Sequence, residues 1–471
     1  MIRGKTVNKY EKLAKNTAIF AVGTFGSKIL SFIMVFFYSR AMQTAEFGML
    51  DIIINSGSLM IPIAMLGITN AIIRFGLDDD YNNKDVITSA FAAVILGFSV
   101  LLLICPLIML IDDLKQYIVL LYAHVLMSAL RHVCSFFVRA DKRMSLYAAD
   151  GIFSTFMTCL LTIIFLIPLK MGIVGYMLAI ILADFCSVIF LCGFGKVFPR
   201  ISFKGFNRKL CAKMIRFALP LMPTSLLWWV VNVSDRYFVK FMISDSANGL
   251  YAAAYKVPTI LTLVSAIFLD AWQISAVSEN KSKEKDEFYS SVFRSFQGGI
   301  FVVGAFLIVL AKLITKILLA KSYYLSWQYI PTLIFATVFS CFVVFLGNIY
   351  LAESKNVATL TTTVAGAVLN LILNYFLIPV FGANGAAIAT LISYFVVFLL
   401  RALDLKYRVK SKVNFCFLKV FINSILMSIQ TIIMITEPKN WLIIQLGIIL
   451  ITIVFNINVL LPLIKKVLRI K

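Results

Sequence analysis

The chain has 471 residues, of which 61% are hydrophobic and only 14% are charged. A soluble protein of this length could not bury so much apolar surface in one core, so the composition indicates a membrane protein. The formal net charge of +22 does not indicate nucleic-acid binding here, because the basic residues lie in short gaps between apolar runs, as in membrane proteins that orient by charge.

Apolar segments of the length that crosses a bilayer, about 20 residues, recur along the whole chain. The first follows a basic start and has no signal-peptide cleavage site, so we expect it to be retained. Backbone polar groups in lipid need internal partners, which predicts an α-helix for each segment. The fourteen segments cover residues 15–39, 49–74, 86–111, 114–138, 146–168, 172–195, 214–241, 250–276, 288–314, 328–352, 357–379, 383–405, 414–436 and 440–464.

Lysine and arginine alternate between rich and poor loops. The gaps before the seventh, ninth and thirteenth segments and the C-terminal tail are basic, whereas the intervening gaps contain few cations. Positive charge stays on the cytoplasmic side. The pattern therefore predicts both termini in the cytoplasm, and we expect a multi-pass protein of a bacterial cytoplasmic (inner) membrane.

The chain also contains an internal repeat. An Ile-Pro pair followed by two glycines in residues 167–175 recurs in residues 378–385, about 210 residues later. This offset equals six predicted helices, so the two copies have the same orientation, as in transporters built from parallel repeats. We expect a cytoplasmic tail (1–13), an N-lobe of helices 1–6 (14–200), a C-lobe of helices 7–12 (201–412), and helices 13–14 with a cytoplasmic tail (413–471).

Ionisable residues fall inside several predicted spans. Such side chains cost a few kcal/mol in lipid unless they face a partner or a water-filled cavity. Lys28 is too deep to reach the interface easily, which favours a cavity, whereas Arg74 near a helix end could reach the interface. The deep charges are Lys28, Arg131, Asp184, Asp235, Arg236, Lys256 and Asp270. The set Asp235, Arg236 and Lys256 fits either a structural ion pair or a cavity wall.

Polar residues form stripes at helical spacing. His124, Ser128 and Arg131 share one face of the fourth segment, where the full charge favours a lumen. A satisfied core imidazole is the simpler interpretation of His124, with a proton relay as the alternative. Asn370 and Asn374 lie on a small and polar face of the eleventh segment, which suits either helix packing or a lumen.

Catalytic and metal-binding patterns are absent from the sequence. It has no H-E-x-x-H, G-x-S-x-G or phosphate-binding G-x-x-x-x-G-K-[ST] pattern. Its eight cysteines form no C-x-x-C pair, so we expect small buried hydrophobes rather than metal ligands. We therefore expect a transporter and not an enzyme, without a cofactor, driven by a gradient whose coupling ion, H⁺ or Na⁺, the sequence leaves open.

A set of short motifs extends along most of the first twelve segments. In the first half the motifs are Leu13–Thr17, Ser39–Ala41, Glu46–Gly48, Gly67–Ile68, Ala71 and Arg74; in the second half they are Pro220–Leu221, Asp235–Arg236, Gly249–Tyr251, Lys256, Asn370–Asn374, Ile378–Pro379, Gly382, Gly385–Ala387 and Ala389–Thr390. In their order and spacing the chain resembles the polysaccharide-transporter branch of the multidrug/oligosaccharidyl-lipid/polysaccharide exporter superfamily, the flippases of O-antigen and capsule repeat units.

This resemblance implies an all-α integral membrane protein with two pseudo-symmetric six-helix bundles around a cavity that opens alternately to each side. The implied cargo is an oligosaccharide on undecaprenyl pyrophosphate, which is flipped to the outer leaflet for surface polysaccharide such as lipopolysaccharide O-antigen or capsule. The implied partners are membrane lipids, with a polysaccharide polymerase or glycosyltransferases as candidate protein partners.

The resemblance and the buried charges together suggest site residues. An anionic pyrophosphate would bind cavity cations; for Lys28 and Arg131 this rests on their depth rather than on a motif. The expected cationic site comprises Lys28, Arg131, Arg236 and Lys256, with Arg40 and Arg74 near the mouths. Asp184, Asp235 and Asp270 would balance these charges or bind a coupling ion, and His124, Ser128, Asn370 and Asn374 would line a polar lumen.

Three alternatives remain at the level of sequence. A lipid II flippase of peptidoglycan synthesis would have the same architecture. A cation-coupled multidrug antiporter would need more acidic lobes, whereas the buried cations here at least match the acids. A membrane-embedded glycosyltransferase or ligase usually has a large extracytoplasmic loop, and no gap between the predicted spans is long enough for one.

Overall fold

The computed structural model describes residues 26–27, 30, 32–78, 80–202, 206–279, 282–353, 355–409 and 411–468. Within these ranges every regular element is a helix. Among the described residues, 11 helices are long and apolar enough to cross a membrane, and Phe32–Ala41 is a shorter apolar helix. The expected all-α membrane fold is confirmed. The total of fourteen spans and the cytoplasmic position of both termini stay predictions.

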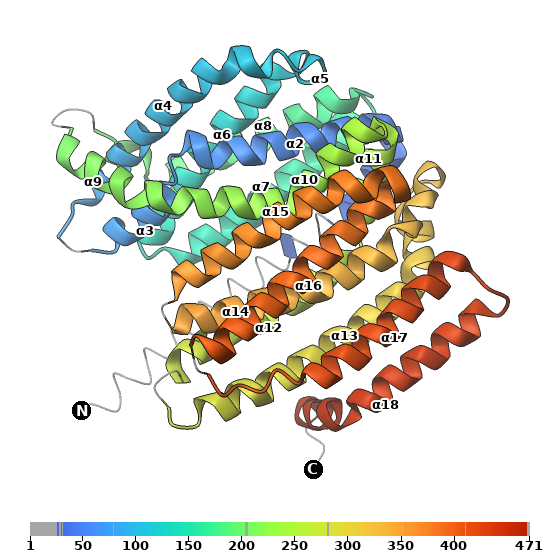
Figure 1. Cartoon of the computed structure of the whole chain (residues 1–471). Helices are drawn as coiled ribbons and strands as arrows, with labels where there is room; N and C mark the ends of the chain where they lie inside the picture. Colours follow the sequence, from blue (N-terminus) through green and yellow to red (C-terminus); the bar gives the residue numbers. More distant parts are fainter. Residues whose placement is uncertain are drawn as a thin grey trace. The chain divides into compact units, whose positions relative to one another are not determined.

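The chain divides into two compact units, Met1–Trp229 and Val230–Lys471; the lobe boundaries expected from the sequence stay predictions. In the first unit, α6 lies centrally and packs against α2, α3, α4, α7 and α8. The helices of this unit, shown from blue to green in Figure 1, are α2 (Thr44–Ala64), α3 (Thr69–Gly76), α4 (Asn83–Ile108), α5 (Asp112–Lys115), α6 (Ile118–Ala140), α7 (Met144–Leu166), α8 (Gly172–Phe194), η1 (Phe198–Arg200), α9 (Arg208–Ala218), η2 (Leu219–Leu221) and the start of α10 (Met222–Met242).

The second unit is built around α14 and α16, which pack against each other, with α15 on α16 and α12 on α14. The last two helices, α17 and α18, pack against each other and against α13, as Figure 1 shows in yellow to red. After the remainder of α10, the helices are α11 (Asp245–Ala254), α12 (Pro258–Glu279), α13 (Lys285–Leu318), η3 (Lys321–Gln328), α14 (Ile330–Ala352), α15 (Asn356–Phe381), α16 (Ala383–Tyr407), α17 (Phe417–Thr436) and α18 (Trp441–Leu468).

Buried amide side chains hold α17 and α18 in this unit. Asn456 Nδ2 on α18 donates to Asn423 Oδ1 on α17 at 3.0 Å. Gln445 Nε2 donates to the Gln430 carbonyl at 2.8 Å, and Gln430 Nε2 donates to the Ala305 carbonyl on α13 at 2.9 Å. Such interhelical hydrogen bonds stabilise helix association in lipid, where the hydrophobic effect between helices is absent.

The repeated sequence motif lies at a connection between two consecutive helices in both units. Gly172 (φ +54°) begins α8 after a short loop, residues 167–171, that follows α7, and Gly382 (φ +60°) lies directly between α15 and α16. These positive φ angles strongly favour glycine, because a Cβ would clash with the backbone. The helices on either side of each turn pack against each other. The motif therefore specifies a helical hairpin in each half.

Replacing Gly382 with alanine should destabilise the second unit by roughly 1–3 kcal/mol, because its φ and ψ of 60° and −146° lie in a region almost restricted to glycine. Thermal unfolding of the detergent-purified variant measures this loss. Gly299→Ala is the matched control: its added Cβ meets no atom within 4 Å, so stability should be kept or slightly raised. Equal melting temperatures for both variants would contradict the argument.

Two predicted spans are interrupted rather than continuous. Residues 49–74 form α2 and α3, separated at Leu66 and Gly67, which both have positive φ (48° and 65°). Residues 250–276 form α11 and α12, separated at residues 255–257 before Pro258. A proline lacks the amide hydrogen and disfavours helical conformation in the residue before it. Lys256, expected within the span 250–276, lies in the turn between α11 and α12. Residues Asp245–Gln273 together still have the length and apolar composition of one membrane span.

Candidate functional site

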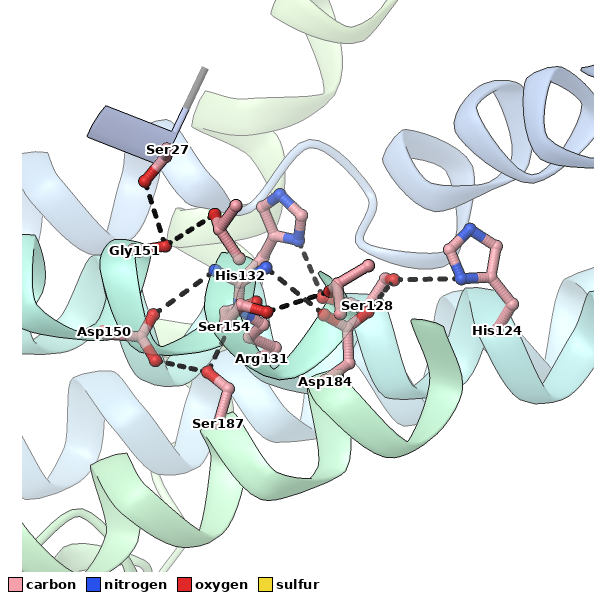
Figure 2. A network of polar contacts seen from close by, with 12 residues as sticks. Ser27, His124, Ser128, Arg131, His132, Asp150, Gly151, Ser154, Asp184 and Ser187 are labelled. Carbon is pink, nitrogen blue, oxygen red and sulfur yellow. Dashed lines mark hydrogen bonds and ion pairs between the residues drawn. The ribbon is translucent and has the colours of Figure 1, made fainter. Parts of the chain in front are cut away.

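A cluster of buried charges connects α6, α7 and α8 in the first unit (Figure 2). Arg131 on α6 forms ion pairs with Asp184 on α8 (Nη1–Oδ1, 3.2 Å) and with Asp150 on α7 (Nη2–Oδ2, 3.5 Å). Its Nε also donates to Ser187 Oγ at 3.0 Å, and Ser187 in turn donates to Asp150. One arginine thus holds three helices together through two carboxylates.

Negative charge exceeds positive charge in this cluster when all three groups are ionised. Asp150 is fully buried and Asp184 is 5% exposed, whereas the Arg131 side chain keeps 24% of its exposure. A buried carboxylate without its own cation is costly and is relieved by a proton or a small cation. The chemistry of the cluster therefore suits proton or cation binding.

Both histidines of the chain lie on the same helix as Arg131. His124 Nδ1 lies 3.3 Å from Ser128 Oγ, and Ser128 donates to Asp184. His132 Nδ1 lies 2.7 Å from the Ser128 carbonyl oxygen, which can only accept, so this nitrogen carries the hydrogen and Nε2 is left as an acceptor. The predicted stripe of His124, Ser128 and Arg131 therefore forms one hydrogen-bonded network.

A second buried carboxylate, Asp235 on α10, lies in the second unit. Asp235 is 0% exposed. Its Oδ2 accepts hydrogen bonds from the hydroxyls of Tyr255 (2.6 Å), Tyr251 (2.8 Å) and Thr390 (3.4 Å), while its Oδ1 accepts from the backbone amide of Arg236 (2.9 Å). Donors from α10, α11, α16 and the α11–α12 break thus surround this carboxylate.

Asn370 and Asn374 on α15 extend the Asp235 cluster. Asn370 Oδ1 accepts from Ser234 Oγ (3.1 Å) and from Asn374 Nδ2 (2.9 Å), and its amide nitrogen lies 3.4 Å from Thr390 Oγ1. Asn374 Oδ1 is buried and has no hydrogen-bond partner in the described part of the chain. Carboxylate, amide and hydroxyl oxygens are the ligands that hard cations prefer, so this cluster could hold a small cation. Among the described residues, no group of three or more His, Cys, Asp or Glu side chains could hold a metal ion.

Arg401 on α16 is a buried cation of a different kind. It is 1% exposed, and its guanidinium donates to the Val343 carbonyl (2.7 Å) and to the hydroxyls of Thr362 and Thr363 (both 3.1 Å). Within the described ranges no carboxylate forms an ion pair with it. These bonds join α14, α15 and α16, so the geometry indicates a structural role.

The other predicted cations are spread over several elements. Lys28 lies outside the described residues. Arg40 is exposed and lies over the Phe36 ring at 3.4 Å, and Arg74 pairs with Asp78 at 3.0 Å. Arg236 is half-buried, with its guanidinium carbon 4.6 Å from the centre of the Tyr255 ring. Whether these residues contact a substrate stays a prediction.

Asp270 on α12 is exposed, unlike Asp184 and Asp235, so the structure does not place it in either buried cluster.

Sequence reasoning missed several members of these clusters. Asp150 lies within the apolar segment 146–168 and could have been found by the criterion that selected Asp184, an ionisable side chain inside a span. Arg401 meets the same criterion in segment 383–405. His132 lies four residues after Ser128 and so shares its helix face, but the predicted stripe did not include it. The two tyrosines around Asp235 look like ordinary apolar-helix residues in the sequence.

The chain matches the family model of polysaccharide biosynthesis proteins over residues 13–273, more than half of its length. Its fold is similar to that of a lipid II flippase MurJ in an inward closed conformation, with 15% identity, a TM-score of 0.70, and coverage of 96% of this chain and 100% of that chain.

Two multidrug transporters also have similar folds. An inward-facing MATE family transporter of the MOP superfamily has 13% identity and a TM-score of 0.65 over 83% of this chain and 96% of that one. A mutant of a Vibrio cholerae MATE transporter has 15% identity and a TM-score of 0.55 over 84% and 98%. None of the curated proteins compared with the chain matches it.

The fold is thus similar to those of a MurJ flippase and of MATE family transporters, and 11 of the described helices have the length and apolar composition of membrane spans. The protein belongs to the polysaccharide biosynthesis protein family, which confirms the resemblance inferred from the sequence motifs.

Proposed function

We propose that the protein is a flippase that moves an undecaprenyl-pyrophosphate-linked oligosaccharide repeat unit from the cytoplasmic to the outer leaflet of a bacterial cytoplasmic membrane, for surface polysaccharide biosynthesis. The family match carries this proposal, because it covers residues 13–273, which include nearly all of the first unit and the start of the second. The similarity to a lipid II flippase over 96% of the chain supports a lipid-linked cargo.

The buried clusters suggest how transport is driven. The excess carboxylate beside Arg131 and the oxygen-rich surroundings of Asp235 each suit a proton or a small cation. Binding of an ion that differs in affinity between two conformations shifts the population of those conformations. We therefore propose that the Asp235 cluster couples transport to an ion gradient and that the Arg131 cluster responds to protonation.

Reconstitution into proteoliposomes tests the cargo directly. With undecaprenyl-pyrophosphate-linked oligosaccharide in the inner leaflet, the protein should make the glycan accessible to an added glycosidase, whereas protein-free liposomes should not. Lipid II in place of the oligosaccharide lipid is the comparison substrate. Flipping of lipid II alone would replace the proposal with the peptidoglycan flippase, and export of a cationic dye with no lipid flipping would replace it with the multidrug antiporter.

A further inference from the structure

A cavity of about 590 Å³ lies at one end of the first unit, between α3, α6 and α9. Two arginines line it: Arg74 in the last turn of α3 and Arg139 in the last turn of α6. Asn70 adds an amide, and Phe136 and Phe217 form apolar walls. The positive-inside pattern predicts that these helix ends face the cytoplasm.

The cavity carries positive charge. Arg139 is half-buried, and the described structure contains no ion pair or hydrogen bond of its side chain. In the part of the chain that the structure describes, Arg74 pairs with Asp78, four residues on, and with no other carboxylate. The Arg74 side chain is 60% exposed, and exposed pairs of this kind are weak. Among the described residues, Asp78 is therefore the one carboxylate that pairs with either arginine of the cavity. Each guanidinium group can bind an oxyanion through two parallel hydrogen bonds.

A simpler explanation is that each arginine interacts with the carbonyl end of its own helix, where cations are favourable. That explanation accounts for each residue alone but not for their convergence on one cavity with an amide donor. A second observation concerns the neighbouring cavity of about 400 Å³, which shares Asn70 and Phe136 with the first and is also lined by His132 and Tyr147. Aromatic rings and uncharged hydrogen-bonding groups are typical of sites for polar, uncharged ligands such as sugars.

We infer that Arg74 and Arg139 bind the diphosphate group of the cargo on the cytoplasmic side, with Asn70 at the junction and the adjoining cavity receiving the first sugar. This inference rests on the proposed function and adds to it a defined diphosphate site. Two adjacent cavities, one cationic and one with aromatic, apolar and uncharged polar walls, match the order of groups in a sugar diphosphate. The arginines would then act at loading, before the cargo moves toward the outer leaflet.

Binding of farnesyl pyrophosphate to the protein in nanodiscs tests the site. Arg139→Gln and Arg74→Gln should each weaken binding about tenfold or more, because each removes a bidentate charge-assisted contact. Lys84→Gln is the matched control: Lys84 is an exposed cation at the start of α4, does not line either cavity, and should bind like the wild type. Arg139→Lys should bind farnesyl pyrophosphate with an affinity between those of the wild type and Arg139→Gln. If Arg139→Gln fails to fold, Arg74→Gln still tests the site, because it replaces a largely exposed side chain.

Two further ligands separate the possible sources of the anion. Farnesol should be insensitive to the arginine variants, because it lacks the diphosphate. Inorganic pyrophosphate bound as tightly as farnesyl pyrophosphate would identify the free anion as a sufficient ligand of the same site; much weaker binding would identify the lipid diphosphate. Unchanged affinity for farnesyl pyrophosphate in both arginine variants, or equal loss in Lys84→Gln, would overturn the site.

The outcome for the site can be distinguished from that for the function. If the wild-type protein flips oligosaccharide lipid and the variants bind and flip normally, the site is wrong and the flippase stands. If the wild type binds farnesyl pyrophosphate through these arginines but flips no lipid-linked glycan, the flippase is wrong and the diphosphate site stands. Absence of any diphosphate binding by the wild type would overturn the site.

Discussion

Replacing Arg131 with glutamine should destabilise the first unit by roughly 3–5 kcal/mol, because it leaves Asp150 and Asp184 buried without their cation. The variant should also fail to flip the cargo. Thermal unfolding in detergent measures the stability, and the proteoliposome assay measures the flipping. Arg208→Gln, the same substitution at an exposed position on α9 of the same unit, should change neither.

A double variant separates a structural from a functional role of the Arg131 cluster. Adding Asp150→Asn to Arg131→Gln removes one buried carboxylate together with the cation, so a large part of the stability should return. If the cluster responds to protonation, flipping should stay lost although the protein is stable again. Flipping that recovers together with stability would show that the cluster only holds α6, α7 and α8 together.

Replacing Asp235 with asparagine should reduce the rate of ion-driven flipping about tenfold or more. A loss of this size corresponds to the usual free energy of coupling between two binding sites. The amide has nearly the same shape and can still accept from Tyr251 and Tyr255, but it lacks the charge that attracts a cation. Initial flipping rates under an imposed Na⁺ or H⁺ gradient measure the loss, and comparison of the two gradients identifies the ion.

A matched control limits the interpretation of the Asp235 result. Glu287→Gln removes one carboxylate charge at an exposed position on α13 of the same unit, and its gradient dependence should equal that of the wild type. The Asp235→Asn protein should also unfold at nearly the wild-type temperature. A variant that flips at the wild-type rate with an intact response to both gradients would remove Asp235 from the coupling mechanism.

The buried and cavity-lining cations differ in the groups that they contact. Arg131 is paired with two carboxylates, and Arg401 bonds only to neutral oxygens among the described residues. Arg139, by contrast, lines an open cavity with no such partner in the described structure. A deep position in a predicted span therefore does not by itself indicate that a cation binds an anionic ligand. A cation without a paired carboxylate is the better candidate.

The sequence by itself determined the features that depend on local composition and short spacing. Apolar runs of spanning length required helices in lipid. The recurring glycines marked the repeated helix connections, and the positive φ of Gly172 and Gly382 in the structure gives the physical reason. The His124, Ser128 and Arg131 stripe was also predictable, because residues three and four apart share a helix face.

Only the tertiary structure decided which partners these side chains have. Asp150 and Asp184 meet Arg131 from other helices, Tyr251 and Thr390 meet Asp235 from elements far apart in the chain, and Arg74 meets Arg139 at one cavity. Periodicity places a residue on a face of its own helix but does not say which helix packs against that face. The charge of a site is the sum over all the helices that meet there, so it is defined only once the helices have packed.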